Sequence, residues 1–401
     1  MAYFIGLMSG TSLDGVDIAL VDVSTQSSRL IAAETYAFDP ALRDKLQKLI
    51  NQKVCSLTQL GQTNIELGLF MAQLVNDFLA KQNSSSQQII AIGNHGQTIY
   101  HAPNVSFPFS LQIGDCNSIA ELTKITTVGD FRQRDMVMKG QGAPLVPAFH
   151  AAQFQHKVES RAIINIGGIA NITYLPANNH QDILGFDTGP GNTLLNSWIE
   201  RHQQCAYDAN GEWAASGYCD DELLHQLLKD SYFRQNIPKS TGREYFNLNW
   251  LDKQLGKTHR YISDTDVQAT LLHLTAHTIA NALKTYCSDI ETCYICGGGA
   301  HNPVLMNLLQ SLMADVNITT TEALGIAPDW VEATAFAWLA YKTLHQQTAN
   351  VPSVTGAKKA VILGAIYSSN DASYSDSVNK ESSCEISSAA SLNNQPSPNA
   401  S

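Results

Sequence analysis

Residues 3–20, YFIGLMSGTSLDGVDIAL, decide the fold. Two apolar runs rich in β-formers, 3–8 and 16–23, flank a turn of small and polar residues, which predicts a strand, a tight turn and a second strand. The same order recurs in residues 161–174, RAIINIGGIANITY. Two such units predict two similar halves with a cleft between them.

Short β-rich runs alternate with helical periodicity along the rest of the chain, which is typical of an α/β protein. The other expected strands are 30–37, 89–92, 125–128, 161–166, 172–175 and 293–296. The expected helices are 41–53, 57–81, 192–202, 266–286, 303–314 and 330–344.

The composition is typical of a large globular protein. It has 401 residues, 44% of them hydrophobic and 15% charged, with a formal net charge of −11. A negative chain opposes nucleic-acid binding, so we expect no nucleic-acid partner. No run approaches the roughly 20 apolar residues of a membrane helix, and no basic segment precedes the first apolar run. With eight scattered cysteines, which fit reduced thiols, we expect a cytoplasmic protein with no membrane partner.

We predict two lobes and a tail. Residues 1–127 would form the first lobe, completed by a C-terminal helix near 345–367, and residues 128–344 the second. Residues 368–401 contain 12 Ser and 5 Asn and few aliphatic side chains. Burial there cannot offset the entropy of ordering, so we expect a disordered tail.

Two familiar motifs are excluded. Residues 251–258, LDKQLGKT, approach a phosphate-binding P-loop but begin with Leu251, where that loop requires glycine. Cys293 and Cys296 have the spacing of a metal or redox pair, but they lie in a run typical of a buried strand, so neither use is expected.

The first glycine cluster, residues 10–17, has the sequence GTSLDGVD. Its glycines let the backbone N–H groups face a polyphosphate, and Thr11 and Ser12 add hydroxyls. The alternative is an ordinary hairpin turn built on Asp14 and Gly15.

Two further glycine clusters could complete a nucleotide site. Residues 185–192, GFDTGPGN, bring Asp187 to a turn before a helix, beside backbone donors for phosphate oxygens. Its alternative is a capped loop with Asn192 as N-cap. Residues 296–302, CGGGAHN, could let a flat ring lie on the backbone, and the alternative there is a tight strand-to-helix turn.

The order of these clusters resembles the actin, hexokinase and chaperone ATPase superfamily. Over residues 3 to about 367 the chain closely resembles the anhydro-N-acetylmuramic acid kinase family. Eight stretches carry the resemblance: 6–17, 93–98, 129–132, 140–147, 165–171, 185–192, 239–247 and 297–302.

The resemblance implies an α/β, two-lobed actin-like ATPase fold, a duplicated ribonuclease H-like fold with its active site in the cleft between the lobes. It implies a kinase that opens the 1,6-anhydro ring of anhydro-N-acetylmuramic acid with water and phosphorylates O6 from ATP. The products would be N-acetylmuramic acid 6-phosphate and ADP, in peptidoglycan recycling and amino-sugar catabolism. A homodimer is also implied.

The same resemblance assigns site residues. Asp187 would be the catalytic base. The nucleotide would contact Gly10, Thr11, Ser12, Leu13, Asp14, Gly15, Val16 and Asp17 in the first loop, Gly189 and Gly191 in the second, and Gly297, Gly298 and Gly299 in the third.

The metal site departs from the superfamily pattern, whereas most of the sugar-binding candidates lie in matching stretches. Most superfamily members carry Asp at the position of Met8, so Asp14 or Asp187 would hold Mg²⁺ through water. Sugar-binding candidates are Arg132 or Arg243 for the lactyl carboxylate, Glu332 for hydroxyls, and Asn94 and His95 along the cleft. For each of them an ordinary structural role is the alternative.

Two other functions stay open at this point. One is an actin-like-fold kinase that phosphorylates an ordinary sugar hydroxyl, with Asp187 deprotonating that hydroxyl. The other is a nucleotide switch without catalysis, which would bind ATP but show no sugar-dependent release of ADP.

Overall fold

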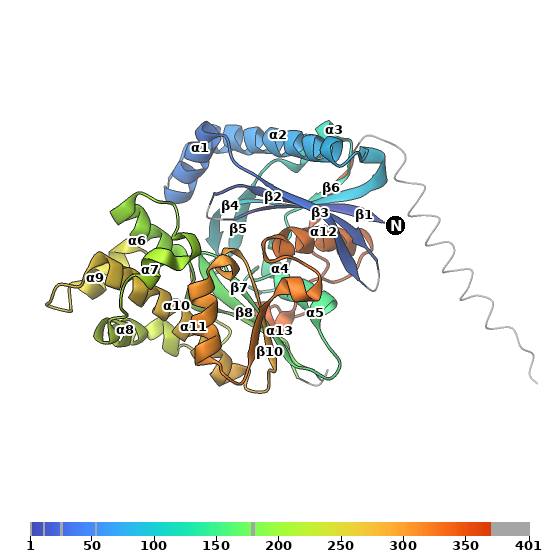
Figure 1. Ribbon diagram of the computed structural model, residues 1–401. Helices are drawn as coiled ribbons and strands as arrows, with labels where there is room; N and C mark the ends of the chain where they lie inside the picture. Colours follow the sequence, from blue (N-terminus) through green and yellow to red (C-terminus); the bar gives the residue numbers. More distant parts are fainter. Residues whose placement is uncertain (1, 11–12, 25–26, 53, 178–180, 370–401) are drawn as a thin grey trace, which may run out of the picture.

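The computed structural model describes all residues except 1, 11–12, 25–26, 53, 178–180 and 370–401. It is a mixed α/β protein built on two sheets (Figure 1), as the sequence predicted. Thr11 and Ser12 of the first glycine cluster, and the predicted tail from residue 370 on, lie outside the described residues.

The two sheets repeat one topology. The first has the order β12-β6-β4-β1-β2-β3, with β5 added to β4, and the second has the order β11-β10-β7-β8-β9. In each, three antiparallel strands, β1–β3 or β7–β9, continue into two parallel ones, β4 and β6 or β10 and β11. This repetition confirms the expected ribonuclease H-like duplication.

The strands have the following bounds: β1 (Tyr3–Ser9), β2 (Val16–Val23), β3 (Ser28–Tyr36), β4 (Ile89–Ala102), β5 (Phe109–Ile113), β6 (Thr127–Gly129), β7 (Arg161–Ile166), β8 (Ile169–Leu175), β9 (Leu184–Pro190), β10 (Thr292–Cys296), β11 (Asn317–Thr320) and β12 (Ala365–Tyr367). Cys293 and Cys296 are buried in β10, in agreement with the strand prediction.

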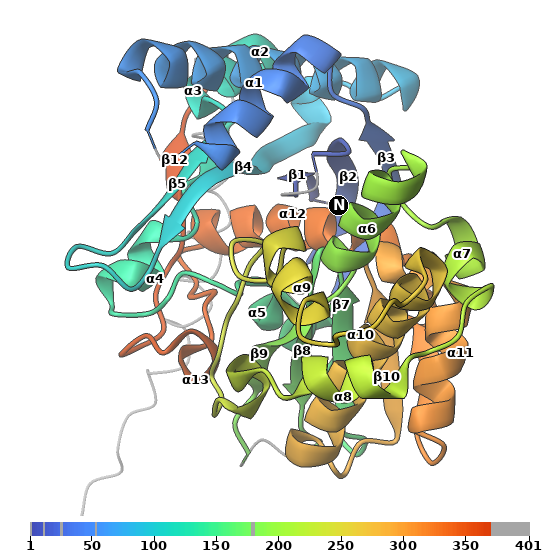
Figure 2. The same ribbon diagram turned by 90° about the vertical axis from the view of Figure 1, so that its left-hand side faces the viewer.

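Helices α1 (Pro40–Asn51), α2 (Leu57–Lys81) and α3 (Cys116–Thr123) cover the outer face of the first sheet (Figures 1 and 2). The remaining helices are α4 (Gln133–Val137), α5 (Val146–Phe154), α6 (Thr193–Gln203), α7 (Glu212–Ala215), α8 (Asp221–Leu228), α9 (Leu248–Leu255), α10 (Asp264–Tyr286), α11 (Pro303–Leu312), α12 (Val331–Leu344) and α13 (Pro352–Thr355), with short 3₁₀ turns at η4 (Gly298–His301) and η6 (Pro328–Trp330). Helix α10 packs on β8 and β9 of the second sheet.

Helix α12 lies between the two sheets (Figures 1 and 2). Its buried side chains share one core with Phe4 of β1 and Ile163 of β7. Two paired glycines, Gly6 and Gly93, let its backbone approach the first sheet, because a Cβ at either position would overlap a carbonyl oxygen of α12. The end of the predicted second lobe thus packs directly against the first sheet.

The C-terminal helix expected near 345–367 has a different structure. The segment contains the single-turn helix α13 and the strand β12, which pairs antiparallel with β6 at the edge of the first sheet. Gly356 and Gly364 have φ of 76° and 82°, a conformation that interrupts helices and favours glycine. The first sheet is therefore completed by a strand.

Among the described residues, no helix combines the length and apolar character needed to cross a bilayer.

The close approach of α12 predicts that Gly6→Ala destabilises the protein. The added Cβ meets the carbonyl oxygen of Ala333, and overpacking of this kind typically costs about 1–3 kcal/mol. Urea unfolding measures the change. The matched control is Gly61→Ala in α2, where an added Cβ meets nothing within 4 Å and helix propensity favours alanine by up to about 1 kcal/mol. Equal stability of the two variants would contradict the packing argument.

Candidate active site

A row of polar side chains crosses the second sheet. Asn165 of β7 pairs with Asn171 of β8, and Asn171 pairs with Asp187 of β9. Residues directly opposite each other on neighbouring strands project from the same face, with strands about 4.8 Å apart. The sheet therefore brings both amides and the carboxylate to the face that α5 and α12 cover.

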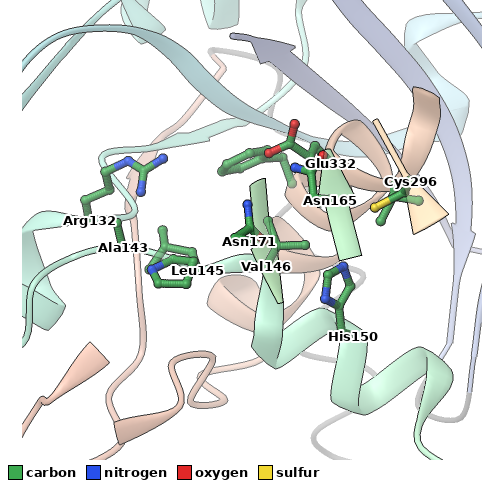
Figure 3. A pocket seen from close by; sticks show the side chains of 12 residues that line it. Arg132, Ala143, Leu145, Val146, His150, Asn165, Asn171, Cys296 and Glu332 are labelled. Carbon is green, nitrogen blue, oxygen red and sulfur yellow. The ribbon is translucent and has the colours of Figure 1, made fainter. Parts of the chain in front are cut away.

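A cavity of about 160 Å³ lies over this row. Figure 3 shows the side chains that surround it, with His150 reaching in from α5 and Glu332 from the start of α12. The lining residues are Arg132, Ala143, Pro144, Leu145, Val146, His150, Asn165, Asn171, Cys296, Val331, Glu332 and Phe336. Asp187 is the next residue of the row beyond Asn171, although it is not itself among the residues that line the cavity.

Residues of the segment 232–241 hold Asp187 in place. The Asp187 N–H donates to the Lys239 carbonyl oxygen at 3.0 Å, and Oδ2 accepts from the Thr241 N–H at 2.9 Å. The Tyr232 hydroxyl donates to the Asp187 carbonyl oxygen at 2.8 Å. Both the backbone and the carboxylate of Asp187 are thereby fixed.

Burial raises the pKa of Asp187 to about 7, and the Thr241 N–H only partly opposes this rise. The nearby Glu244 carboxylate raises the pKa further, while Lys239 lowers it. A carboxylate with a pKa near the working pH is a much better proton acceptor than a solvated aspartate. The site thus supplies what a general base needs.

Arg132 and His95 form a fixed pair. His95 Nδ1 lies 2.8 Å from the Gly96 carbonyl oxygen and so carries the proton, which leaves Nε2 to accept from Arg132 Nη2 at 2.8 Å. Burial lowers the pKa of His95 to about 3 and that of Arg132 to about 10. A neutral His95 therefore orients a charged Arg132 at the cavity, and Nη1 donates to the Gly142 carbonyl oxygen at 2.8 Å.

Asn94 and His95 lie behind Arg132 and are not among the lining residues. The Asn94 side chain donates to the Gly114 carbonyl oxygen and accepts from the Gly96 N–H, which fixes the backbone of β4. Direct contact of either residue with a sugar stays a prediction.

Glu332 faces the cavity from the first turn of α12. Burial raises its pKa, and the charge of Arg132 and a hydrogen bond with Asn165 oppose that rise. The sequence prediction that Glu332 lies at the substrate cavity is consistent with this position.

Carboxylates of the first glycine cluster lie near those at the start of α12. Burial raises the pKa of Asp17 to about 7, and the like charges of Asp14, Glu332 and Asp329 add to the rise. The Thr35 hydroxyl donates to Asp17 Oδ1 at 2.7 Å. Negative charge is thus concentrated beside the predicted phosphate loop, where a cation would relieve it.

Backbone hydrogen bonds hold the second cluster against the turn between β7 and β8. The N–H groups of Gly191, Asn192 and Thr193 donate to the carbonyl oxygens of Gly167 and Gly168. The Asn192 side chain donates to the Ile166 carbonyl oxygen at 3.2 Å and makes no capping bond to α6. The alternative is therefore right that Asn192 is the N-cap residue of α6, although its side chain does not make the capping hydrogen bond. Phosphate contacts at Gly189 and Gly191 stay a prediction.

The third cluster leaves open space at its centre. A Cβ at Gly298 would have only Asn192 Nδ2 near it, at 3.9 Å, whereas a Cβ at Gly297 or Gly299 would overlap β7. The outer two glycines let the turn lie on β7, and Gly298 borders space that a ligand can fill.

Arg243 lies between the first and second clusters. A Cβ on Gly168 would stand 3.1 Å from Arg243 Nη2. Burial lowers the pKa of Arg243, and the charge of Asp14 opposes this. Nε is buried and has no partner among the residues that the structure describes. Of the two arginines considered for the sugar carboxylate, only Arg132 lines the cavity.

The family model described as anhydro-N-acetylmuramic acid kinase matches residues 2–369. The chain belongs to this family. The anhydro-N-acetylmuramic acid kinase of Pasteurella multocida is 50% identical over 366 residues, which cover 91% of this chain and 96% of that one. The anhydro-N-acetylmuramic acid kinase of Coxiella burnetii is 50% identical over 364 residues, covering 91% and 97%.

Among solved structures, the (R)-2-hydroxyglutaryl-CoA dehydratase component A of Acidaminococcus fermentans is 10% identical to this member of the anhydro-N-acetylmuramic acid kinase family. The likeness covers 86% of this chain and 100% of that one, with a TM-score of 0.43. Membership of the family makes the chain an ATP-dependent kinase, a phosphotransferase with an alcohol acceptor, as the sequence predicted.

Several site residues had no assigned role in the sequence analysis. Asn165 and Asn171 lie in a family-like stretch, but only the pairing of β7, β8 and β9 brings them to Asp187. Thr241 likewise lies in such a stretch without any signal that its N–H reaches a carboxylate. His150 lies outside all the stretches, and no local pattern places it at the cavity.

Proposed function

We propose that the chain opens the 1,6-anhydro ring of 1,6-anhydro-N-acetylmuramic acid with water and transfers the γ-phosphoryl group of ATP to O6. The products are N-acetylmuramic acid 6-phosphate and ADP, in peptidoglycan recycling. The observation that carries the proposal is a buried aspartate, Asp187, whose raised pKa suits a general base and which pairs with Asn171, one of the residues that line the cavity.

In the proposed step, the Asp187 carboxylate takes a proton from a water molecule as the water oxygen bonds to C1. The C1–O6 bond breaks, O6 bonds to the γ-phosphorus, and the bond from the γ-phosphorus to the β-phosphate oxygen breaks to release ADP. Such a base typically contributes about 10² to 10⁴ in rate, and C1 passes through an oxocarbenium-like state. One distinctive catalytic side chain suffices, because phosphoryl transfer depends mainly on positioning and charge neutralisation.

The polar residues of the cavity suit the sugar. Arg132, whose guanidinium His95 and Gly142 orient, would bind the lactyl carboxylate. Glu332 would accept hydrogen bonds from sugar hydroxyls. Asn165 and Asn171 would orient the ring beside Asp187.

The nucleotide would lie along the three glycine clusters. Gly10 and residues 13–17 would contact the phosphates, and the open space at Gly298 would hold the adenosine. Arg243 would neutralise phosphate charge. It lies near Asp14 and Gly168, and its buried Nε has no partner in the part of the chain that the structure describes.

Mg²⁺ fits the carboxylates near the first cluster. Within the described part of the chain no three His, Cys, Asp or Glu residues converge to bind a metal directly, and Mg²⁺ usually keeps several waters. The crowded charges that raise the pKa of Asp17 would be relieved by a hydrated cation held by Asp14 and Asp17. When bound, it would neutralise phosphate charge.

The proposal extends to location and assembly. We place the enzyme in the cytoplasm, which agrees with the unpaired state of the seven cysteines in the described residues.

A homodimer is also proposed. The β4–β5 hairpin exposes an apolar surface that a second copy could cover, formed by Tyr100, Val105, Phe107 and Phe109.

The proposed reaction predicts two linked results with purified protein, Mg²⁺-ATP and anhydro-N-acetylmuramic acid. ADP release should depend on the sugar, and in ¹⁸O-labelled water the product should carry label at C1 when sampled before the anomeric oxygen exchanges. Phosphorylation without label would instead indicate a kinase of an ordinary hydroxyl. Nucleotide binding without sugar-dependent ADP release would indicate a switch.

The positions of Arg132 and Arg243 predict that their variants affect different substrates. Arg132→Gln should raise the KM for the sugar by about 10-fold or more, because a charge-assisted hydrogen bond is worth roughly 1.5–3 kcal/mol. Arg243→Gln should raise the KM for ATP by a comparable factor. Steady-state kinetics measures both KM values in both variants, and each variant is the control for the other. A raised KM for ATP in Arg132→Gln and for the sugar in Arg243→Gln would contradict these assignments.

A further inference from the structure

His150 is a buried side chain that the proposed reaction does not use. It is 2% exposed and lines the cavity. Nδ1 lies 2.9 Å from Thr173 Oγ1. Nε2 is buried and has no hydrogen-bond partner among the described residues. Figure 3 shows the ring reaching up from α5 toward the cavity, below Val146 and Asn165.

The register of β8 places His150 next to the row of polar side chains. Thr173 follows Asn171 by two residues, so both side chains project from the same face of β8, about 6.7 Å apart along the strand. A side chain bonded to Thr173 therefore lies one step below the row of Asn165, Asn171 and Asp187. A sugar seated on that row would extend a substituent toward His150.

An unpaired nitrogen in this place is available to a ligand. A buried polar atom without a hydrogen bond is unfavourable, so a bound group that pairs with it is stabilised. Burial lowers the pKa of His150 to about 3, so the ring is neutral and Nε2 either donates or accepts, depending on how the Thr173 hydroxyl is oriented. The missing partner is thus a polar group that a neutral imidazole can bond, either as donor or as acceptor.

The rest of the cavity restricts the chemistry of that group. Seven of the twelve lining residues are apolar: Ala143, Pro144, Leu145, Val146, Cys296, Val331 and Phe336. A group that joins a donor and an acceptor to a methyl fits both His150 and these walls. A hydroxyl alone would satisfy the nitrogen and leave the apolar surface uncovered.

We propose that His150 Nε2 hydrogen-bonds the acetamido group on C2 of the sugar, and that this contact selects 2-acetamido over 2-hydroxy anhydrosugars. The inference rests on the proposed function and deepens it. Thr173 acts as a positioning residue, because its hydroxyl fixes the ring through Nδ1.

The test compares two substrates in three variants. kcat/KM is measured with anhydro-N-acetylmuramic acid and with the analogue that has a hydroxyl in place of the acetamido group. His150→Phe should lower kcat/KM for the acetamido sugar by about 10- to 100-fold, because a partner left unpaired in a buried site costs about 1–3 kcal/mol, and should change the hydroxyl analogue much less. His150→Gln, which restores a polar group, should recover part of the loss.

The matched control is His156→Phe, the same substitution at a surface histidine whose side chain is 45% exposed. This variant should leave the ratio of the two kcat/KM values unchanged. Thermal melting establishes that the variants fold. If His150→Phe does not fold, Thr173→Val is measured in its place. It should lower the ratio of kcat/KM for the acetamido sugar to kcat/KM for the hydroxyl analogue. A loss that is equal for both sugars, or no loss, overturns the assignment, because Nε2 would then bind only water. A wild-type protein inactive on the acetamido sugar would instead refute the proposed function.

Discussion

The register among β7, β8 and β9 determines where the proposed catalytic groups lie. It sets Asn165, Asn171 and Asp187 side by side on one face of the sheet. A slip of β8 by one residue would turn Asn171 and Thr173 to the opposite face, which packs against α10. The alignment of Asp187 with the two asparagines and the contact of Thr173 with His150 depend on this pairing pattern.

Helix α12 connects that face to the other sheet. Gly6 and Gly93 let its backbone rest on the first sheet, and its first turn carries Glu332 to the cavity beside Asn165. The cavity therefore lies where α12 meets both halves of the duplication, and Asp17 of the first glycine cluster is close enough to Glu332 for their charges to interact. Burial at this junction raises the pKa of the Asp17 and Asp187 carboxyls alike, which is the usual electrostatic consequence of placing carboxylates in a site with few donors.

Local sequence was enough to predict the duplicated hairpins and the long helix α2, because alternation, helical periodicity and turn residues act over a few positions. It missed β9, whose glycines and proline favour a turn and whose extended form depends on pairing with β8. It also assigned α12 to the second lobe only, because the contact between Gly6 and Ala333 joins positions more than 300 residues apart. Asp187 was found through a resemblance. Its partners Asn171 and Thr241, and the cavity at His150, depend on tertiary contacts that no local pattern encodes.

The central claim is that Asp187 accepts the proton from water, and the pH dependence of kcat/KM tests it most directly. Because the base must be ionised, a pKa raised to about 7 predicts that kcat/KM increases with pH up to a plateau above about pH 8. Asp17 has a similarly raised pKa, so the profile is also measured in Asp17→Asn, where the inflection should persist. Asp187→Asn should lose the inflection and at least about 10² in turnover. A flat profile between pH 5 and 8 with substantial turnover in Asp187→Asn would contradict the account.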